Sequence, residues 1–384
     1  MSSSTQAKKT IALFYPAFMG GGAEAVGLWM IEALKEDYDV TLFTVAEVDF
    51  DHLNAMYGTQ LSPQVVKLKT PFSATWRSLC HFLIANNGDL RGIFFHLLIR
   101  YFKQQNQSYD LLISAYNAVD LGRPGIQYIH WVNVVEGNAF QQSISKFSDA
   151  QVRENWAIAN SKYVAEAVQR NYGIDSTVIY PPVLLSPPQI TWEEKENAFI
   201  CSGRLTPAKE PHKVIQTLQK VREKGFDVKL YLTSGGGGAY DWQYSNYIKK
   251  LVKENSDWIM LYENLAYADY VKVMAKCRYG IHVKKEPFGI SIAEMVKANL
   301  IPFVRTIGGQ IEIVGAQNTD LFFERQEDAA EKIINVLGNQ ELQQQLRASL
   351  AQQKSLFSTE RFMTEIKQFV DQHFEKTAPA TTTA

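Results

Sequence analysis

The fold is decided by residues 280–304, which read GIHVKKEPFGISIAEMVKANLIPFV. Residues 280–283 form a short apolar run that predicts a strand, and residues 301–304 form a second one. Between them, a loop that contains a proline and a glycine leads into a helical pattern. A strand, a helix and a strand in this order predict two neighbouring parallel strands.

The same alternation of strands and helices extends from this stretch in both directions. Further strands are expected at residues 11–15, 40–45, 111–114, 126–130, 156–159 and 177–180, and at 199–202, 228–233, 259–261 and 321–323. Such an alternation is typical of parallel, doubly wound α/β sheets. Two series predict two Rossmann-like domains, at residues 1–186 and 187–358. Residues 181–196 contain two proline pairs, which suit a linker between domains.

The composition fits a globular protein with two such domains. The chain has 384 residues, of which 46% are hydrophobic and 21% are charged, and its net charge is −1. Because neither half is basic, nucleic acid is not expected as a partner. The three cysteines lie far apart in the sequence. The sequence contains no run of about 18 apolar residues, the length that is needed to span a membrane. We therefore expect a cytoplasmic protein without a disulfide framework.

A glycine-rich loop follows the first expected strand. Gly20, Gly21 and Gly22 precede Ala23 and Glu24, where a helix is expected to begin. Glycines let the backbone approach a ligand closely, and a helix N-terminus offers free N–H groups to an anion. A tight turn with a purely structural role is the alternative interpretation.

Two cations follow the first strand of the second half. Arg204 comes directly after Gly203, and Lys209 follows five residues later. Ligands of doubly wound sheets bind at the carboxyl ends of the strands. Arginine grips phosphate with two hydrogen bonds, and lysine adds a point charge, so the pair can neutralise a diphosphate leaving group. Alternatively, both side chains are solvated surface cations.

The most specific motif is the pair Glu286 and Glu294, which lie eight residues apart around the start of a helix. Phe288, Gly289 and Ile290 lie at this helix start, where backbone N–H groups can bind a sugar hydroxyl or a phosphate. Glu294 can accept both hydroxyls of a ribose, and Glu286 precedes the helix where a donor sugar would lie. Capping and surface roles are the alternative.

In combination, these motifs resemble retaining glycosyltransferase family four, the glycosyl transferases group 1. The likeness covers most of residues 10–370. It rests on the glutamate pair with residues 295–302 and 308–309, on residues 203–209, on the glycine loop and on residues 160–163 and 178–183. Residues 20–24, 128–130 and 180–183 look like the branch that contains the lipid-linked-oligosaccharide α-1,2-mannosyltransferases.

The resemblance implies the GT-B fold, in which two doubly wound domains face each other across a cleft. It places the acceptor on the first domain and the nucleotide-sugar on the second, and a C-terminal helix at residues 359–374 back on the first. It also implies that His130 faces the donor sugar and is catalytic together with Glu286. Gly21, Gly22, Arg204, Lys209, Phe288, Gly289, Ile290 and Glu294 would bind the nucleotide-sugar.

The expected reaction is the transfer of a hexose of the mannose or glucose type, with retention of anomeric configuration, to a hydroxyl group. The donor is a GDP- or UDP-linked sugar. No Asp-x-Asp motif is present, so we expect neither a metal nor another cofactor. An epimerase or phosphorylase on the same fold, or a non-catalytic sugar-nucleotide-binding protein, are the alternatives.

Two departures from the family pattern matter. Asn299 stands where the family usually has glycine, but asparagine tolerates a left-handed backbone better than most residues. Residues 131–133 read Trp-Val-Asn in place of a segment that contains proline, which leaves the acceptor open.

Residues 76–102 are rich in aromatic residues and leucine, with interspersed arginines. They predict either two helices that cover the sheet or a surface that contacts a membrane and admits a lipid-linked glycan. In the second case the protein would lie at the inner face of the membrane, and replacing Phe94 and Phe95 with aspartate would release it.

Overall fold

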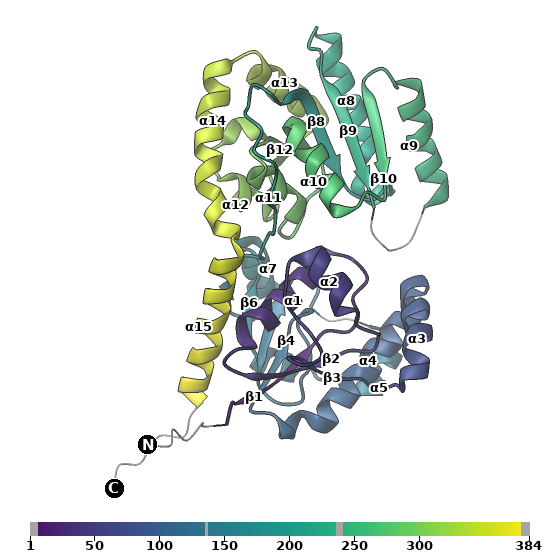
Figure 1. Cartoon of the computed structure of the whole chain (residues 1–384), viewed down its shortest axis with the longest axis vertical. Helices are drawn as coiled ribbons and strands as arrows, with labels where there is room; N and C mark the ends of the chain where they lie inside the picture. The colour runs from purple at the N-terminus through teal and green to yellow at the C-terminus, as the bar shows by residue number, and fades with distance from the viewer. Residues whose placement is uncertain (1–6, 135–136, 236–240, 378–384) are drawn as a thin grey trace. The chain divides into compact units, whose positions relative to one another are not determined.

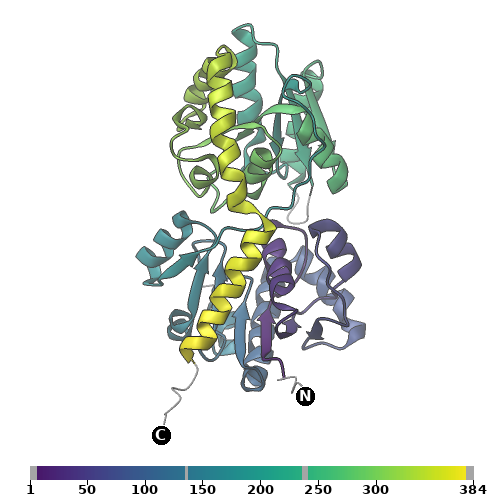
Figure 2. The same ribbon diagram turned by 60° about the vertical axis from the view of Figure 1, so that its left-hand side comes forward.

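The computed structural model describes residues 7–134, 137–235 and 241–377. The chain forms two compact units. Unit 1 comprises Met1–Asn160, Ala165–Pro182 and Ser358–Ala384, and unit 2 comprises Ser161–Val164 and Val183–Phe357. Figures 1 and 2 show helices on both sides of the sheet in each unit.

Unit 1 is built on a seven-stranded parallel sheet with the strand order β3-β2-β1-β4-β5-β6-β7. Its strands are β1 (Thr10–Phe14), β2 (Asp39–Phe43), β3 (Lys67–Lys69), β4 (Leu111–Ser114), β5 (Ile126–Ile129), β6 (Trp156–Ala159) and β7 (Ser176–Val178). Its helices are α1 (Gly22–Leu34), α2 (Phe50–Tyr57), α3 (Ala74–Asn86), α4 (Gly88–Gln105), η1 (Asn106–Ser108), α5 (Ala139–Ser145), α6 (Asp149–Glu154) and α15 (Thr359–Thr377). Helix α7 (Lys162–Tyr172) begins in unit 2 and continues in unit 1.

Unit 2 is built on a six-stranded parallel sheet with the strand order β10-β9-β8-β11-β12-β13. Its strands are β8 (Glu196–Ser202), β9 (Lys229–Ser234), β10 (Ile259–Glu263), β11 (Cys277–His282), β12 (Ile301–Arg305) and β13 (Phe322–Phe323). Its helices are η2 (Pro207–Lys209), α8 (Pro211–Glu223), α9 (Trp242–Glu254), α10 (Tyr267–Lys276), α11 (Ile290–Lys297), α12 (Gln310–Val314), η3 (Thr319–Leu321), α13 (Gln326–Leu337), α14 (Gln340–Gln353) and η4 (Lys354–Phe357).

The two predicted doubly wound sheets are therefore confirmed. Every predicted strand is present, with ends that differ by up to three residues. Strand β3 was missed because its sequence, Lys-Leu-Lys, has only one apolar residue and lies at the sheet edge. The left-handed turn expected at Asn299 is also confirmed, since its φ angle is +62°.

Helix α15 packs on unit 1 and runs beside α1 (Figure 2). Its Phe362 and His373 contact the aromatic rings of Tyr128 and Trp156, with ring centroids 6.2 and 4.8 Å apart. Its residues Phe362, Ile366 and Val370 are buried and form the apolar stripe by which an amphipathic helix packs on a protein core.

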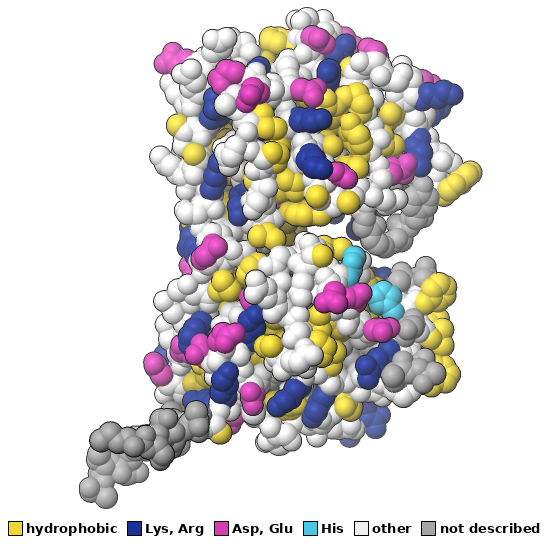
Figure 3. Space-filling model, viewed as in Figure 1, with side chains coloured by type: hydrophobic (Ala, Val, Ile, Leu, Met, Phe, Trp, Pro, Cys, Tyr) yellow, Lys and Arg dark blue, Asp and Glu magenta, His cyan; other side chains and the backbone are white. Residues whose placement is uncertain are grey.

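Helices α3 and α4 differ in how far their apolar side chains are exposed. In α4, Phe95 is only 5% exposed and packs with Phe14 in the core of unit 1. The interpretation that Phe95 faces a membrane is therefore wrong, because the sheet buries it. On α3, by contrast, Trp76, Leu79 and Phe82 are 58%, 44% and 63% exposed. Figure 3 shows apolar side chains along the edge of unit 1 where α3 lies.

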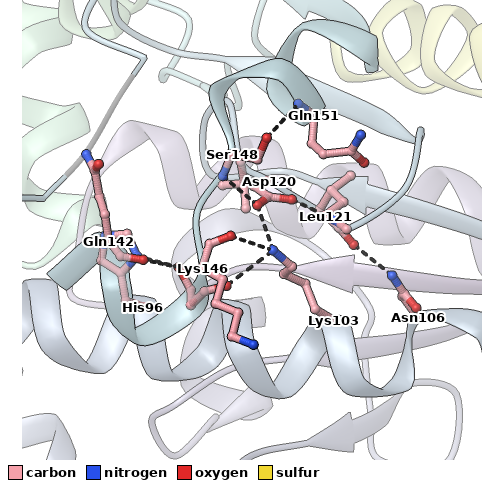
Figure 4. A network of polar contacts seen from close by, with 12 residues as sticks. His96, Lys103, Asn106, Asp120, Leu121, Gln142, Lys146, Ser148 and Gln151 are labelled. Carbon is pink, nitrogen blue, oxygen red and sulfur yellow. Dashed lines mark hydrogen bonds and ion pairs between the residues drawn. The ribbon is translucent and has the colours of Figure 1, made fainter. Parts of the chain in front are cut away.

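A buried polar network fixes α4 to the segments that follow it in the chain (Figure 4). The Lys103 ammonium lies 2.7 Å from Asp120 Oδ2 and also donates to the carbonyl oxygens of Ser145 and Lys146, both at 3.2 Å. The Asp120 carboxylate is fully buried and accepts the backbone N–H groups of Gly122 and Ser148 at 2.9 and 2.8 Å. Both oxygens of the buried Asp120 carboxylate and all three N–H groups of the Lys103 ammonium therefore have partners.

Candidate functional site

The candidate site of unit 2 lies where the strand order of the sheet reverses. From β8 the chain continues to β9 and β10 on one side, whereas β11 and the later strands lie on the other side. Strands β8 and β11 are hydrogen-bonded neighbours, so the loops that follow them meet at one edge of the sheet. In doubly wound sheets this switch point is where ligands bind. Here a small pocket is lined by Gly203, Arg204, Lys209 and His282.

The structure brings Lys209 and Glu286 together at this edge. The ammonium of Lys209 lies 2.5 Å from Glu286 Oε1, and His282 Nε2 lies 3.1 Å from the same oxygen. Burial opposes ionisation of Glu286, but the hydrogen bond from His282 and the charge of Lys209 outweigh it and lower the pKa to about 2. Glu286 is therefore a carboxylate at neutral pH.

Arg204 lies beside this pair but outside it. Its side chain is exposed, and none of the described carboxylates lies within ion-pair distance of it. A phosphate in the pocket could therefore bind the guanidinium of Arg204, which has no carboxylate partner among the described residues. It could also bind the ammonium of Lys209, which has three N–H donors and uses one of them for Glu286.

The loop that carries Glu286 is held by Gln310, the first residue of α12. Gln310 is fully buried; its Oε1 accepts the N–H of Glu286 at 2.9 Å, and its Nε2 donates to the carbonyl oxygen of Lys284 at 3.1 Å. Gly308 and Gly309 pack so closely on this loop that an added Cβ would lie 2.5 Å from Glu286 O and 2.1 Å from Pro287 O. Both glycines are therefore required for this approach of two backbones.

Glu294 lies one turn inside α11 and is engaged by two tyrosines of α10. The hydroxyl group of Tyr270 donates to Glu294 Oε2 at 2.9 Å, and the hydroxyl oxygen of Tyr267, which donates its proton to the carbonyl oxygen of Leu184, lies 3.4 Å from Glu294 Oε1. Burial raises the pKa of Glu294 to about 7, although the hydrogen bond from Tyr270 opposes the rise. A carboxylate has about four acceptor positions, so these two tyrosines leave acceptor positions of Glu294 unused.

Gly289 and Ile290 begin α11 as the sequence predicted. Gly289 has a φ of +116°, a conformation that favours glycine, and it is the N-cap of the helix. Phe288 is 3% exposed, and its ring packs on Phe357 with centroids 5.7 Å apart. Its side chain is thus part of the core, which leaves only its backbone for contact with a ligand.

In unit 1, the glycine loop between β1 and α1 is clamped by Glu24 and Tyr57. The Tyr57 hydroxyl accepts the N–H of Gly21 at 3.1 Å and lies 3.0 Å from Glu24 Oε2, while Glu24 Oε1 accepts the N–H of Met19. Burial raises the pKa of Glu24 to about 7 against these hydrogen bonds. Gly20 has a φ of +87°, and an added Cβ at Gly21 would meet nothing within 4 Å, so the loop surface is open to a ligand.

His130 ends up buried and neutral. It follows β5 and is 5% exposed, and burial lowers its pKa to about 4 although a hydrogen bond to the carbonyl of Ala115 opposes this. Its Nε2 lies 2.8 Å from Ala115 O, which can only accept, so we assign the proton to Nε2 and the lone pair to Nδ1. The backbone of His130 is fixed by the side chains of Asn117 and Asn160.

Sequence reasoning missed His282, Gln310, Tyr57, Tyr267 and Tyr270. Only His282 carried a local signal, since it is a polar residue at the end of a buried strand, four residues before Glu286. The others reach the site from helices 24 to 36 residues away in the chain.

The comparisons with known proteins agree with this geometry. Residues 185–353 match the family Glycosyl transferases group 1. This segment covers most of unit 2 and contains Arg204, Lys209, Glu286 and Glu294. No curated protein sequence matches the chain.

Several solved glycosyltransferase structures are similar over nearly the whole chain. HepE from Anabaena, in complex with UDP and glucose, has a TM-score of 0.66 at 17% identity, with 95% of this chain and 100% of that chain covered. A glycosyltransferase from Rickettsia africae gives 0.66 at 17% identity, with 97% and 100% covered. Sucrose-phosphate synthase from Thermosynechococcus elongatus gives 0.66 at 16%, with 96% and 100% covered. The protein therefore has the GT-B fold.

Replacing Tyr57 with phenylalanine should weaken the clamp on the glycine loop. Since the hydroxyl contacts both Gly21 and Glu24, we expect a loss of about 1 kcal/mol in the free energy of unfolding. We also expect turnover of the donor to fall about tenfold, because the loop is no longer fixed. Chemical denaturation and nucleotide release measure the two effects. Tyr247→Phe, at an exposed position on α9, is the matched control. Normal turnover in Tyr57→Phe would mean that the contacts of Tyr57 contribute to stability but not to activity.

Proposed function

We propose that the protein is a retaining glycosyltransferase that moves a hexose of the mannose or glucose type from a nucleotide-sugar to a hydroxyl group of a glycan or lipid-linked glycan. The family match of unit 2 and the GT-B fold support transfer of a sugar. HepE was solved with UDP-glucose, and the pneumococcal O-GlcNAc transferase GtfA with UDP and GlcNAc. A UDP-hexose is therefore the first donor to test, followed by GDP-mannose.

The observation that carries the proposal is the cluster of Arg204, Lys209 and Glu286 at the switch point of the unit 2 sheet. Two cations there suit the diphosphate of a nucleotide-sugar. A carboxylate with a pKa of about 2 stays charged, so it can stabilise positive charge that develops on the sugar ring.

In the proposed step, the acceptor hydroxyl oxygen forms a bond to the anomeric carbon while the bond from that carbon to the diphosphate oxygen breaks. The proton of the hydroxyl passes to the departing diphosphate oxygen, on the same face of the sugar. Arg204 and Lys209 stabilise the negative charge of the diphosphate. No oxidant, reductant or metal is needed to balance this step.

The remaining site residues have supporting roles in the proposal. Glu294 binds the ribose, and Gly289 and Ile290 provide N–H groups at the start of α11. Gly21 and Gly22 contribute backbone groups to the donor. His130, as a neutral ring, accepts a hydrogen bond from a sugar hydroxyl through Nδ1.

The proposal is tested by nucleotide release from a panel of UDP-, GDP- and ADP-sugars. Slow hydrolysis of one donor, lost in Arg204→Ala and Glu286→Ala but kept in Arg325→Ala, would support a transferase and name the donor. Arg325 is an exposed arginine of the same unit. Nucleotide binding without turnover, even with glycan acceptors present, would instead indicate a non-catalytic sugar-nucleotide-binding protein.

A metal-independent reaction is part of the proposal. Within residues 7–134, 137–235 and 241–377, no three His, Cys, Asp or Glu side chains come together as a metal site would require. Loss of transfer after treatment with a chelator would contradict this part.

We further propose that unit 1 contacts the cytoplasmic face of a membrane through α3. Trp76, Leu79 and Phe82, here called the α3 stripe, are spaced by three residues and so share one face of the helix. No helix in the described part of the chain is long and apolar enough to cross a bilayer. The stripe would instead rest in the interface.

Replacing Trp76 and Phe82 together with serine should weaken binding to phosphatidylcholine–phosphatidylglycerol vesicles about 100-fold, since two large apolar side chains no longer insert. Co-sedimentation measures the effect. Trp242→Ser removes a similarly exposed tryptophan, 67% exposed compared with 58% for Trp76, from α9 of unit 2 and should not change vesicle binding. Wild-type protein that fails to bind vesicles would overturn the membrane proposal.

A further inference from the structure

Unit 1 contains a pocket of about 350 Å³. The resemblance places the acceptor on this half of the chain, but neither the motifs nor the comparisons assign a ligand to the pocket. Its lining includes residues that follow four neighbouring strands: Pro16 after β1, Val45 after β2, Tyr116 after β4 and Trp131 after β5. Strands β2 and β3 lie on one side of β1 in the sheet, and strands β4 to β7 lie on its other side. The pocket therefore lies at the switch point of the unit 1 sheet, where such folds bind ligands. Its volume is within the range of small-molecule sites.

One wall of this pocket carries a positive charge. Arg91, on the first turn of α4, is half-buried, and its Nε donates to the carbonyl oxygen of Ile84 at 3.1 Å. Among the residues that the structure describes, no aspartate or glutamate lines the pocket, and no carboxylate is within ion-pair distance of Arg91. The guanidinium is thus fixed at one end and has its terminal nitrogens available for an anion, for which its planar geometry suits phosphate.

The part of the pocket lining that follows β4 and β5 is aromatic and suits a sugar ring. Trp131 is half-buried, and its ring meets that of Tyr116 edge-on, with centroids 5.3 Å apart at 85°. Aromatic faces offer a flat apolar surface for the C–H face of a pyranose, and the side-chain amide of Asn133, which also lines the pocket, can bind its hydroxyl groups. Gln141 plays no such part, because its amide is occupied by Asp89 O and Asn138 N.

The pocket is also linked to the α3 stripe. Ile84, in the last turn of α3, lines the pocket, so the helix that carries Trp76 and Phe82 ends at the pocket wall. A lipid-linked glycan has its phosphate at the junction between the apolar chain and the sugar. Unit 1 has the matching groups: an apolar helix that ends at the pocket, and an arginine and aromatic residues that line it.

We propose that this pocket binds the acceptor, and that the acceptor is a sugar that carries a phosphate. Arg91 binds the phosphate, and Trp131 holds the accepting sugar. This inference rests on the proposed transferase function. The phosphate can belong to a polyprenyl-linked glycan or to a soluble sugar phosphate, which present the same chemistry to Arg91.

The test measures binding to the full chain by titration calorimetry with glucose and with glucose 1-phosphate. The nucleotide found in the donor screen is kept at saturation, so that the cations of unit 2 are occupied. We expect glucose 1-phosphate to bind at least about tenfold more tightly than glucose, as a charged hydrogen bond provides. Arg91→Gln should remove this preference, and Trp131→Ala should weaken both sugars. Arg100→Gln, an exposed arginine of the same helix, should retain wild-type values.

A second arm separates the two sources of the phosphate. Phosphatidylcholine vesicles with polyprenyl phosphoglucose are compared with vesicles that contain the free polyprenol. If binding depends on Arg91 only with the vesicles, the inference is supported and the acceptor is a lipid-linked glycan. If binding depends on Arg91 only with glucose 1-phosphate, the inference is supported and the acceptor is a soluble sugar phosphate. Equal affinity for phosphorylated and neutral probes in both arms, or a preference that survives Arg91→Gln, would overturn it. Donor hydrolysis by the wild type is scored separately, so failure of this inference is distinguishable from failure of the transferase proposal.

Discussion

Lys209→Met should lower turnover of the nucleotide-sugar about 100- to 1,000-fold, the usual cost of removing one group that stabilises charge in a transition state. Lys209 has two tasks in the proposed site. It neutralises the diphosphate as the bond to the sugar breaks, and it keeps the Glu286 carboxylate charged from 2.5 Å away. Nucleotide release at saturating donor measures the loss.

The pH profile of Lys209→Met distinguishes these two tasks. In the wild type, the pKa of Glu286 is about 2, so the carboxylate is ionised throughout the working range. Without Lys209, burial is opposed mainly by the hydrogen bond from His282, so the pKa of Glu286 rises. A reaction that needs the carboxylate should then gain an acidic limb, with the remaining activity rising as pH rises through the new pKa.

The matched control for this experiment is Lys213→Met. Lys213 lies four residues later and forms an ion pair with Glu210, but it does not line the pocket. An equal loss in Lys213→Met, or normal turnover in Lys209→Met, would contradict the role of Lys209. Lys209→Arg keeps the charge and should recover part of the activity.

The unit 2 site shows how far sequence reasoning reaches. That Lys209 and Glu286 lie near each other followed from two strands whose loops open at the same edge of a sheet. Their direct pairing did not follow, because a loop's path and a lysine rotamer depend on tertiary packing. The same limit applies to Glu294, whose tyrosine partners come from the neighbouring helix α10.

Unit 1 shows a different limit. Apolar residues in α3 and α4 have similar sequence patterns, yet Phe95 is in the core and Phe82 is 63% exposed. Periodicity predicts which residues share a helix face, but which face meets the sheet is decided by the packing of the whole unit. The unit 1 pocket was not predicted for the same reason, since Arg91, Tyr116 and Trp131 come from three separate segments.

Lys103→Met should destabilise unit 1 by about 3 kcal/mol or more, the cost of leaving a buried charge without its partner. Asp120 is fully buried, and its carboxylate would keep only the N–H groups of Gly122 and Ser148. The carbonyl oxygens of Ser145 and Lys146 would also lose their donor (Figure 4). The midpoint of guanidinium denaturation of the full chain, together with hydrogen exchange in α4, measures the change.

The controls for Lys103→Met separate charge burial from loss of packing. Arg100→Met removes an exposed cation one turn earlier on α4 and should change the free energy of unfolding by less than about 0.5 kcal/mol. The double variant Lys103→Met/Asp120→Asn removes the unpaired charge, so it should be more stable than Lys103→Met alone. If the double variant is less stable by the sum of both single losses, the two side chains are not coupled and the ion pair is not what fixes α4 to residues 145–148.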